Sequence, residues 1–356
     1  MTWLQQVSGT RFLSGVGGFL CLGLLSSGLL SGQSTAFAAE ADVHERIRDR
    51  GHVVCGTAND EMGFSSVSSD GEWSGLYIDL CQAIAIAVLG DDRAVKFVPL
   101  VGTRMFGSLR DGKIDVLARN TAWTASRDLQ ANVSFAGTFF YDGKSFLIRK
   151  SSGILSALEL SGADACLIEG SLTEASVRRY FSKRGMKFNS KPSETWTEVL
   201  ENYKKRTCLV LAADSVQLSI LRNSLDDKDE HSLLPEKFEI DAFGPYVSSK
   251  DDDWRKAVAW IIHALVMAEE QNITRNNISD MQKSVGKNKR SIFAIAEVVG
   301  KQMGFVENWF VKMIEATGHY GEVFERNLGK GSAINLNRGP NRPVSLGGLL
   351  RAPALR

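Results

Sequence analysis

Two charged residues lie where predicted strands end, and together they could bind a zwitterion. Arg127 belongs to the polar segment 119–128, which follows a predicted strand at 114–118 and leads toward a helix. Asp214 directly follows the apolar run 208–213, a second predicted strand. Ligands of α/β folds bind at the carboxyl ends of strands. There Arg127 and nearby backbone amides could hold a carboxylate, and Asp214 could accept a hydrogen bond from an ammonium group. The pattern therefore favours an amino-acid-like ligand.

The alternative for Arg127 is a structural role, in which it pairs with Asp128 or caps a helix. Other motifs that could carry chemistry fail in detail. Gly143-Lys144-Ser145 is similar to part of a phosphate-binding loop, but five residues instead of four separate Gly143 from Gly137, and bulky aromatic residues lie between them. The sequence has no Cys-x-x-Cys motif and no Cys/His cluster. We therefore expect no catalytic centre, no metal and no cofactor.

The N-terminal segment is typical of an exported protein. Residues 1–38 contain no acidic residue and one base, Arg11; an apolar run covers 12–30, and Ala36-Phe37-Ala38 is a small-x-small cleavage pattern. The alternative is an uncleaved anchor, because the apolar run is long enough to span a bilayer. Without Arg11, 41 of the 42 Lys and Arg residues remain against 41 Asp and Glu. A neutral chain without a basic stripe excludes nucleic acid as a partner.

Four cysteines remain after residue 38: Cys55, Cys81, Cys166 and Cys208. An even number in an oxidising compartment predicts disulfides. Three pairings are possible and the sequence does not choose among them. We prefer Cys55–Cys81 with Cys166–Cys208, since each bridge then stays within one half of the chain. Four buried free thiols are the alternative.

Strands and helices alternate along the chain, which predicts parallel strands joined by helical crossovers. With 356 residues, 44% of them apolar, the chain is long enough for two compact lobes. A helix around 254–268 has the clearest apolar face, and three acids, Asp251 to Asp253, precede it. His263 on this helix is interpreted as a packed or surface residue. The predicted strands are 51–57, 95–100, 114–118, 140–148, 165–170, 208–214 and 238–248, and the other predicted helices are 78–89, 105–109, 173–184, 292–303 and 306–317.

Several short segments of the sequence are informative by their order and spacing. They are Val54-Cys55-Gly56, Gly63-Phe64-Ser65, Trp73-Ser74-Gly75-Leu76, Ile78-Asp79-Leu80-Cys81, Val98-Pro99-Leu100, Ile114-Asp115-Val116-Leu117, Arg119-Asn120-Thr121, Trp123-Thr124, Tyr141-Asp142-Gly143 and 320–327. In these segments the sequence resembles the extracellular solute-binding proteins of the polar-amino-acid type (family 3), and specifically the branch serving general L-amino-acid transporters. The resemblance covers about residues 45–330, and all four mature cysteines fall where this branch has them.

The resemblance implies an α/β fold of the periplasmic-binding-protein type, with two α/β lobes joined by two hinge strands near 140–148 and 240–248. We expect a first lobe at 39–143 and 244–328 with a C-terminal helical extension, and a second lobe at 144–243. These follow the signal peptide at 1–38, and the Gly-, Pro- and Arg-rich composition after residue 328 predicts a flexible basic tail at 329–356. The implied function is that of a periplasmic receptor, which captures an amino acid or related zwitterion and delivers it to the membrane permease of an ABC transporter.

The same resemblance implies that Arg127 binds the ligand carboxylate and Asp214 its amino group. It extends the binding site to Asn120, Thr121, Ala122, Phe64, Glu61, Ser171 and Leu172. The residues that depart from the family pattern are Ala122, Leu172, Ala212, Ala213, Tyr77 and Glu61. The lost hydroxyl groups predict a more apolar pocket, Glu61 adds an acidic group near its mouth, and we expect altered specificity. Two other functions stay open. One is an enzyme of the periplasmic dehydratase type, with Glu61 as its acid; the other is a degenerate binding or sensory protein that does not serve transport.

Overall fold

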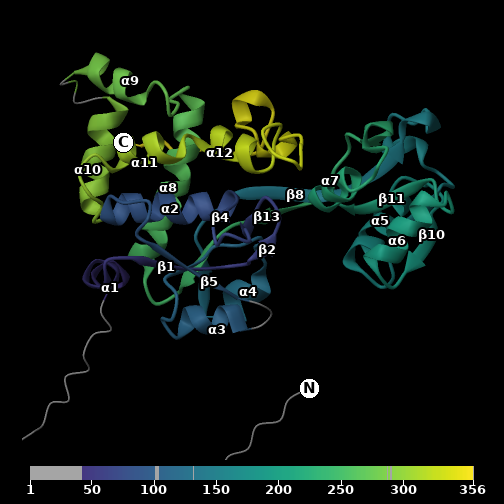
Figure 1. Ribbon diagram of the computed structural model, residues 1–356, viewed down its shortest axis with the longest axis horizontal. Helices are drawn as coiled ribbons and strands as arrows, with labels where there is room; N and C mark the ends of the chain where they lie inside the picture. The colour runs from purple at the N-terminus through teal and green to yellow at the C-terminus, as the bar shows by residue number, and fades with distance from the viewer. Residues whose placement is uncertain (1–41, 101–103, 131, 287, 289–290, 356) are drawn as a thin grey trace, which may run out of the picture. The chain divides into compact units, whose positions relative to one another are not determined.

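The computed structural model describes residues 42–355 except 101–103, 131, 287, 289 and 290 (Figure 1). The predicted signal peptide, residues 1–38, lies outside the described residues. None of the helices in the described part of the chain has the length and apolar character needed to cross a bilayer.

The first sheet has five strands in the order β5-β1-β6-β14-β7. Strand β1 is buried at every residue and runs parallel to its two neighbours, β5 and β6. A continuous apolar run is typical of a strand that is covered on both faces, which is why the sequence predicted this strand. The strand bounds are β1 (Val53–Thr57), β5 (Val95–Pro99), β6 (Val116–Leu117), β7 (Val133–Phe135) and β14 (Tyr246–Ser248).

The second sheet contains six strands, with β10-β9-β11-β8-β12 in order and β13 also paired to β8. β9 and β11 are parallel neighbours, whereas β8 is antiparallel to β11, β12 and β13. The bounds are β8 (Phe140–Arg149), β9 (Asp164–Ile168), β10 (Asn189–Ser193), β11 (Val210–Asp214), β12 (His231–Leu233) and β13 (Phe238–Phe243). A third, small antiparallel sheet contains β2 (Asp60–Glu61), β3 (Ser65–Val67) and β4 (Trp73–Ser74).

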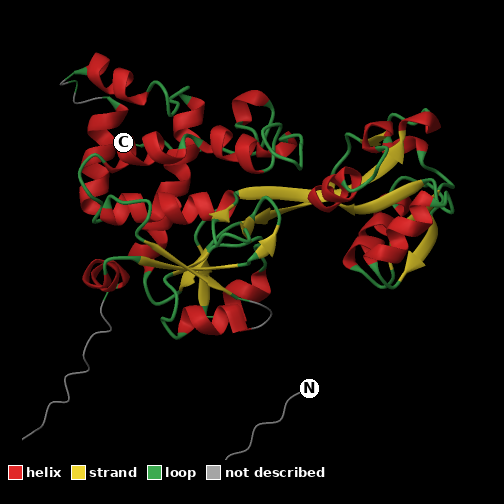
Figure 2. Ribbon diagram, in the orientation of Figure 1, coloured by secondary structure: helices red, strands yellow, loops and turns green. Residues whose placement is uncertain are grey.

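Helices pack against these sheets, as Figure 2 shows in red. Helix α2 is buried along almost its whole length and contacts α8 and α11, while α5 and α6 contact β9 and β11. Asp251 caps α8 by accepting a hydrogen bond from the backbone N–H of Trp254 at 2.7 Å. The bounds are α1 (Val43–Arg50), α2 (Leu76–Leu89), α3 (Arg104–Arg110), α4 (Ala125–Gln130), α5 (Leu172–Ser182), α6 (Trp196–Lys204), α7 (Ser215–Asn223), α8 (Asp252–Glu270), α9 (Ile278–Val285), α10 (Ile292–Gln302), α11 (Trp309–Thr317) and α12 (Tyr320–Asn327).

The long strand predicted at 238–248 is instead two strands, β13 and β14, which belong to different sheets. The break falls at Gly244 and Pro245, and proline cannot donate a hydrogen bond to a strand ladder. Gly244 also passes so close to Gly137 that a Cβ atom at position 244 would lie 2.0 Å from the Gly137 carbonyl oxygen. A glycine is therefore required where the chain crosses from one sheet to the other.

The C-terminal segment, residues 329–355, differs from the flexible tail that we expected. Asn341 is fully buried, and Ile334, Leu336 and Leu350 join the hydrophobic core of the first sheet. Arg338 donates to both carboxylate oxygens of Glu269 on α8. The Gly-, Pro- and Arg-rich composition suggested a loose arm, but these few apolar and polar side chains attach it at specific positions.

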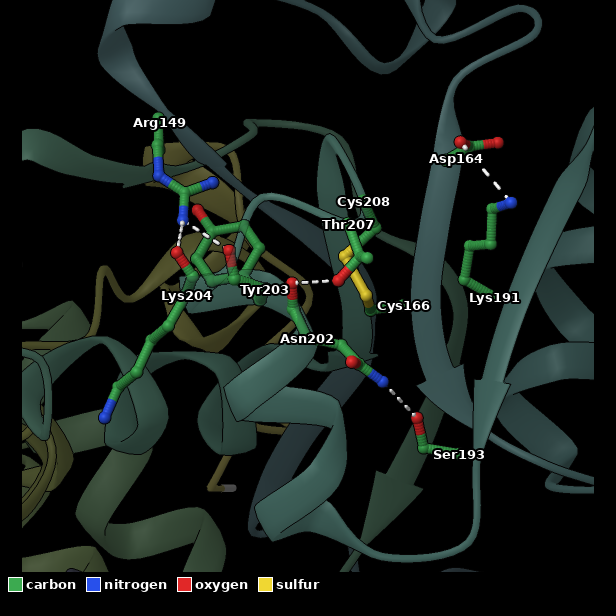
Figure 3. Close-up of a disulfide and its surroundings, with 10 residues drawn as sticks. All are labelled: Arg149, Asp164, Cys166, Lys191, Ser193, Asn202, Tyr203, Lys204, Thr207 and Cys208. Carbon is green, nitrogen blue, oxygen red and sulfur yellow. Dashed lines mark hydrogen bonds and ion pairs between the residues drawn. A yellow bond between two sulfur atoms is a disulfide. The ribbon is translucent and has the colours of Figure 1, made fainter.

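Both preferred disulfides are formed. Cys55 on β1 is joined to Cys81 on α2, and Cys166 on β9 is joined to Cys208, two residues before β11. Figure 3 shows the second disulfide and the nearby Asn202. The side chain of Asn202 donates to Ser193 Oγ, and the backbone carbonyl oxygen of Asn202 accepts from the hydroxyl of Thr207. The first bridge thus links a strand to the helix packed beside it, and the second links a strand to the segment that leads into the neighbouring strand β11.

Candidate functional site

Arg127 lies on the short helix α4, and none of the described residues provides a carboxylate partner for it. Its guanidinium donates to the carbonyl oxygen of Ala122 and lies over the Phe106 ring, 6.0 Å from the centroid. Asp128 instead accepts from Trp123 Nε1 at 2.5 Å. Within the described part of the chain, no acidic group forms an ion pair with Arg127, so the alternative pairing with Asp128 is absent.

The segment before Arg127 is tied to the crossing between β13 and β14. The carbonyl oxygen of Ala122 also accepts from the hydroxyl of Tyr246 at 3.0 Å. The backbone N–H of Gly244 donates to Thr121, and Ala122 forms an isolated β-bridge with Phe243. Thr121 is buried, Ala122 is half-buried, and a change in the crossing would therefore move both residues.

Beside this segment, Glu61 and Arg119 form an ion pair. Arg119 also donates to the carbonyl oxygen of Leu100 at 2.7 Å. Two side-chain oxygens here, Glu61 Oε2 and Asn120 Oδ1, are buried and accept no hydrogen bond from any described residue. Unpaired buried acceptors are costly, which favours a polar ligand or solvent at this place.

Phe64, expected beside the site, is a core residue. It is 4% exposed and packs edge-on to Phe140 of β8, with ring centroids 5.0 Å apart. Tyr77 is completely buried next to it, with ring centroids 6.1 Å apart. Burial raises the pKa of the Tyr77 hydroxyl well above its usual range, and the nearby charge of Glu61 acts in the same direction. Tyr77 therefore contributes to the core beneath the site.

Ser171 and Leu172 lie at the start of α5. The Ser171 hydroxyl accepts from the backbone N–H of Glu174 at 3.1 Å and donates to the carbonyl oxygen of Ile168 at 2.7 Å, so it caps the helix. Leu172 is the first residue of α5, and its side chain lies outside the described residues. The cap accounts for a serine at this position without a ligand.

Asp214 ends β11 and takes the N-cap position of α7, yet its carboxylate accepts no capping hydrogen bond from that helix. Its partner is Lys144 on the adjacent strand β8, with 2.8 Å between Lys144 Nζ and Asp214 Oδ1. The Asp214 side chain is 46% exposed. The neighbouring Asp142 is buried, which raises its pKa, and it accepts hydrogen bonds from Ser215 and the backbone N–H of Gly143. Of the carboxylates of Asp142 and Asp214, that of Asp214 is the accessible one.

The structure brings the expected site residues together in two groups. Ala122 contacts Arg127 directly, and Glu61 contacts Arg119 next to Asn120. Asp214 belongs to a separate group with Lys144, and among the described residues no hydrogen bond or ion pair joins Arg127 to Asp214. Lys144, and Asp241 of β13 at 3.9 Å from Lys144 Nζ, were not predicted as site residues. Lys144 could have been identified from the sequence, because it is a charged residue in the middle of the apolar strand 140–148.

Residues 53–277 match the family described as bacterial extracellular solute-binding proteins, family 3. The chain belongs to this family. It is 37% identical over 323 residues to the general L-amino acid-binding periplasmic protein AapJ of Rhizobium johnstonii, covering 90% of this chain and 95% of that protein. It is 34% identical to the glutamate/glutamine/aspartate/asparagine-binding protein BztA of Rhodobacter capsulatus, covering 90% and 95% of the two chains.

A solved structure is also similar to this family 3 chain. It is an ABC transporter periplasmic binding protein from Brucella ovis with glutathione bound, 38% identical, with a TM-score of 0.73. The match covers 89% of this chain and all of that chain. The predicted family and the α/β fold of the periplasmic-binding-protein type are therefore confirmed, and these relatives are named as binding proteins.

Proposed function

We propose that this family 3 protein is a periplasmic receptor for an amino acid or a related zwitterion. In this proposal Arg127 binds the ligand carboxylate and Asp214 binds its ammonium group. Asn120, Thr121 and Ala122 line the Arg127 side, with Glu61 and Phe64 nearby, and Ser171 and Leu172 reach the ligand from the start of α5. The ligand is then delivered to the membrane permease of an ABC transporter, and a signal peptide cleaved near Ala38 directs export.

The observation that carries the proposal concerns the contacts of Arg127 and Asp214 within the protein. Arg127 has no carboxylate partner among the described residues, and Asp214 does not cap the helix that it precedes. A bidentate contact between a guanidinium and a carboxylate is among the strongest polar contacts in proteins. An α-amino acid carries the two complementary groups. The names of AapJ and BztA, both amino-acid-binding proteins, support the same ligand class.

We assign Arg127 to a first lobe, 39–143 with 244–328, and Asp214 to a second lobe, 144–243. Sheet membership supports this division, because the strands from β8 to β13 form the second sheet and β14 returns to the first. The connections are β8 and the β13–β14 crossing. Hinge closure around a ligand, a mode known for periplasmic binding proteins, would bring the two charges to opposite ends of one zwitterion.

A dehydratase-type enzyme is the alternative on the same fold. Its candidate acid, Glu61, is ion-paired with Arg119. The similar proteins are named for binding, so we propose that the chain is not an enzyme. Formation of product from prephenate or arogenate would support the alternative.

A thermal-shift screen tests the receptor, because a ligand that binds only the folded form raises the melting temperature. The screen should include the common L-amino acids, glutathione, opines and small carboxylates. Each hit is paired with its 2-oxo acid, which lacks the ammonium group, and with its amide, which lacks the carboxylate. We expect shifts only where both groups are present, and loss of the shift in Asp214→Asn. Equal shifts with the 2-oxo acids, or none with any α-amino acid, would contradict the proposal.

A further inference from the structure

Lys144 lies between two carboxylates at the Asp214 end of the proposed site. Its Nζ is 2.8 Å from Asp214 Oδ1 and 3.9 Å from Asp241 Oδ2. The Lys144 side chain is only 11% exposed, whereas those of Asp214 and Asp241 are 46% and 53% exposed. β8 pairs with β11, where Lys144 is opposite Asp214, and with β13, where Asp241 is opposite Asp142, two residues before Lys144.

Lys144 is held in its charged form. Burial alone would lower its pKa, but the hydrogen bond and charge of Asp214, together with the charges of Asp241 and Asp142, raise the pKa above its usual value. The three groups Lys144, Asp214 and Asp241 therefore carry one positive and two negative charges. Asp142, which is also close, faces the opposite charge of Lys237.

The charges of these three side chains limit how many cationic groups a bound ligand can carry at this place. One negative charge remains uncompensated, and one ammonium group balances it. Without Lys144, two carboxylates would be open to two cationic groups. With Lys144 present, a second ligand cation would meet the like charge of Lys144, whose side chain is 11% exposed, and salt screens a buried charge less than an exposed one.

We propose that Lys144 is a specificity-determining residue, which excludes dibasic amino acids by filling the second cation position between Asp214 and Asp241. The inference rests on the proposed function, in which Asp214 accepts the α-ammonium group. It names the ligand class more closely: amino acids whose single cationic group is the α-ammonium.

The test compares ligands that differ by one charge. L-Lysine is L-norleucine with an added terminal ammonium group, and L-ornithine has the same relation to L-norvaline. Dissociation constants for all four are measured by calorimetry at pH 7 in the wild type and in Lys144→Gln, which keeps a polar side chain without the charge. Lys144→Met serves as a second variant if the glutamine variant does not fold. Lys191→Gln is the control, because Lys191 pairs with Asp164 at 3.7 Å on β10 and β9, outside the proposed site.

We expect the wild type to bind norleucine at least tenfold more tightly than lysine. In Lys144→Gln the ratio of the lysine dissociation constant to the norleucine dissociation constant should fall at least tenfold, and in Lys191→Gln it should be unchanged. Adding Asp241→Asn to Lys144→Gln should reverse the gain, because one of the two carboxylates is then lost.

A ratio that is the same in the wild type and Lys144→Gln overturns the inference, as does failure of Lys144→Gln to bind lysine or ornithine. If α-amino acids still bind in either case, the proposed receptor function stands and only the role of Lys144 is wrong. If the wild type binds no α-amino acid at all, the receptor function fails and this inference falls with it.

Discussion

The side-chain amide of Asn341 pairs with both backbone hydrogen-bonding groups of Tyr141, 200 residues earlier in the chain. The backbone N–H of Tyr141 donates to Asn341 Oδ1 at 2.6 Å, and Asn341 Nδ2 donates to the Tyr141 carbonyl oxygen at 2.8 Å. Tyr141 is the second residue of β8 and pairs with Ala242 of β13. The C-terminal segment thus attaches to the strand that we propose as a hinge.

Replacing Asn341 by alanine should destabilise the protein, because two partly buried backbone groups of Tyr141 lose their partner. Each buried group left unpaired costs about 1–3 kcal/mol. We expect the free energy of unfolding of Asn341→Ala to fall by at least about 2 kcal/mol in urea titrations. Asn337→Ala, at an exposed position of the same segment, should change it by less than about 0.5 kcal/mol. Equal effects of the two substitutions would show that the contact with Tyr141 does not hold the segment.

Much of the fold follows from local pattern. The apolar runs of β1, β8, β9 and β11 are buried in sheets, and the apolar face of α8 packs in the core. These elements could be predicted because burial on one or both faces leaves a periodic trace in the sequence. The break between β13 and β14 was missed because both segments are typical of strands, and only Gly244-Pro245 marks the crossing. The attached tail was missed because its anchors are few and lie among turn-forming residues.

The site could be predicted only in part. Arg127 and Asp214 were identifiable because a position at the end of a strand is a local property. The pairing of Asp214 with Lys144 depends on the antiparallel register of β8 and β11, which the sequence does not reveal at a separation of about 70 residues. Lys144 was considered only as part of a phosphate-binding pattern and was set aside with that pattern. Strand register, and not a local motif, places the ammonium group of Lys144 in the proposed site.

His263 should make stability depend on pH in the mildly acidic range. It is half-buried on α8, edge-on to Trp260 with ring centroids 5.5 Å apart, and burial lowers its pKa. The unfolded chain, in which a histidine has a pKa of about 6.5, therefore binds more protons than the folded chain. It follows that stability is lost as the pH falls below about 6.5.

His263→Phe keeps an aromatic ring against Trp260 and removes the titration. The variant should lose less stability than the wild type between pH 7 and 5.5, with a slope shallower by at most about 1.4 kcal/mol per pH unit. The measurement is the free energy of unfolding in urea at several pH values. Burial also lowers the pKa of His44, His231 and His319, so a smaller slope remains in the variant. Identical slopes in both proteins would show that His263 does not contribute.

The Cys166–Cys208 bridge should stabilise the second sheet. It closes a loop with a sequence separation of 42 residues, for which loop-closure entropy gives about 4 kcal/mol. We expect the free energy of unfolding of Cys166→Ala/Cys208→Ala to be lower than that of the wild type by this amount, so that the variant unfolds at a lower urea concentration. Reduction of the wild type with dithiothreitol in urea should lower the free energy of unfolding by the same amount, plus the amount that Cys55–Cys81 contributes. A loss under about 1 kcal/mol would contradict the expectation.

Arg127→Lys tests whether the geometry of the guanidinium matters as well as its charge. A lysine keeps the positive charge but cannot form two parallel hydrogen bonds to one carboxylate. Hydrogen bonds to charged groups contribute about 1.5–3 kcal/mol each, so affinity for an α-amino acid should fall by roughly 10- to 100-fold. Because Arg127 is only half-buried and forms no ion pair among the described residues, the melting temperature without ligand should change little. Arg93→Lys, at a side chain that is 89% exposed, is the matched control and should bind as the wild type does. Unchanged affinity in Arg127→Lys would mean that the ligand carboxylate is held elsewhere, whereas a large drop in melting temperature would assign Arg127 a structural role through its contact with Ala122.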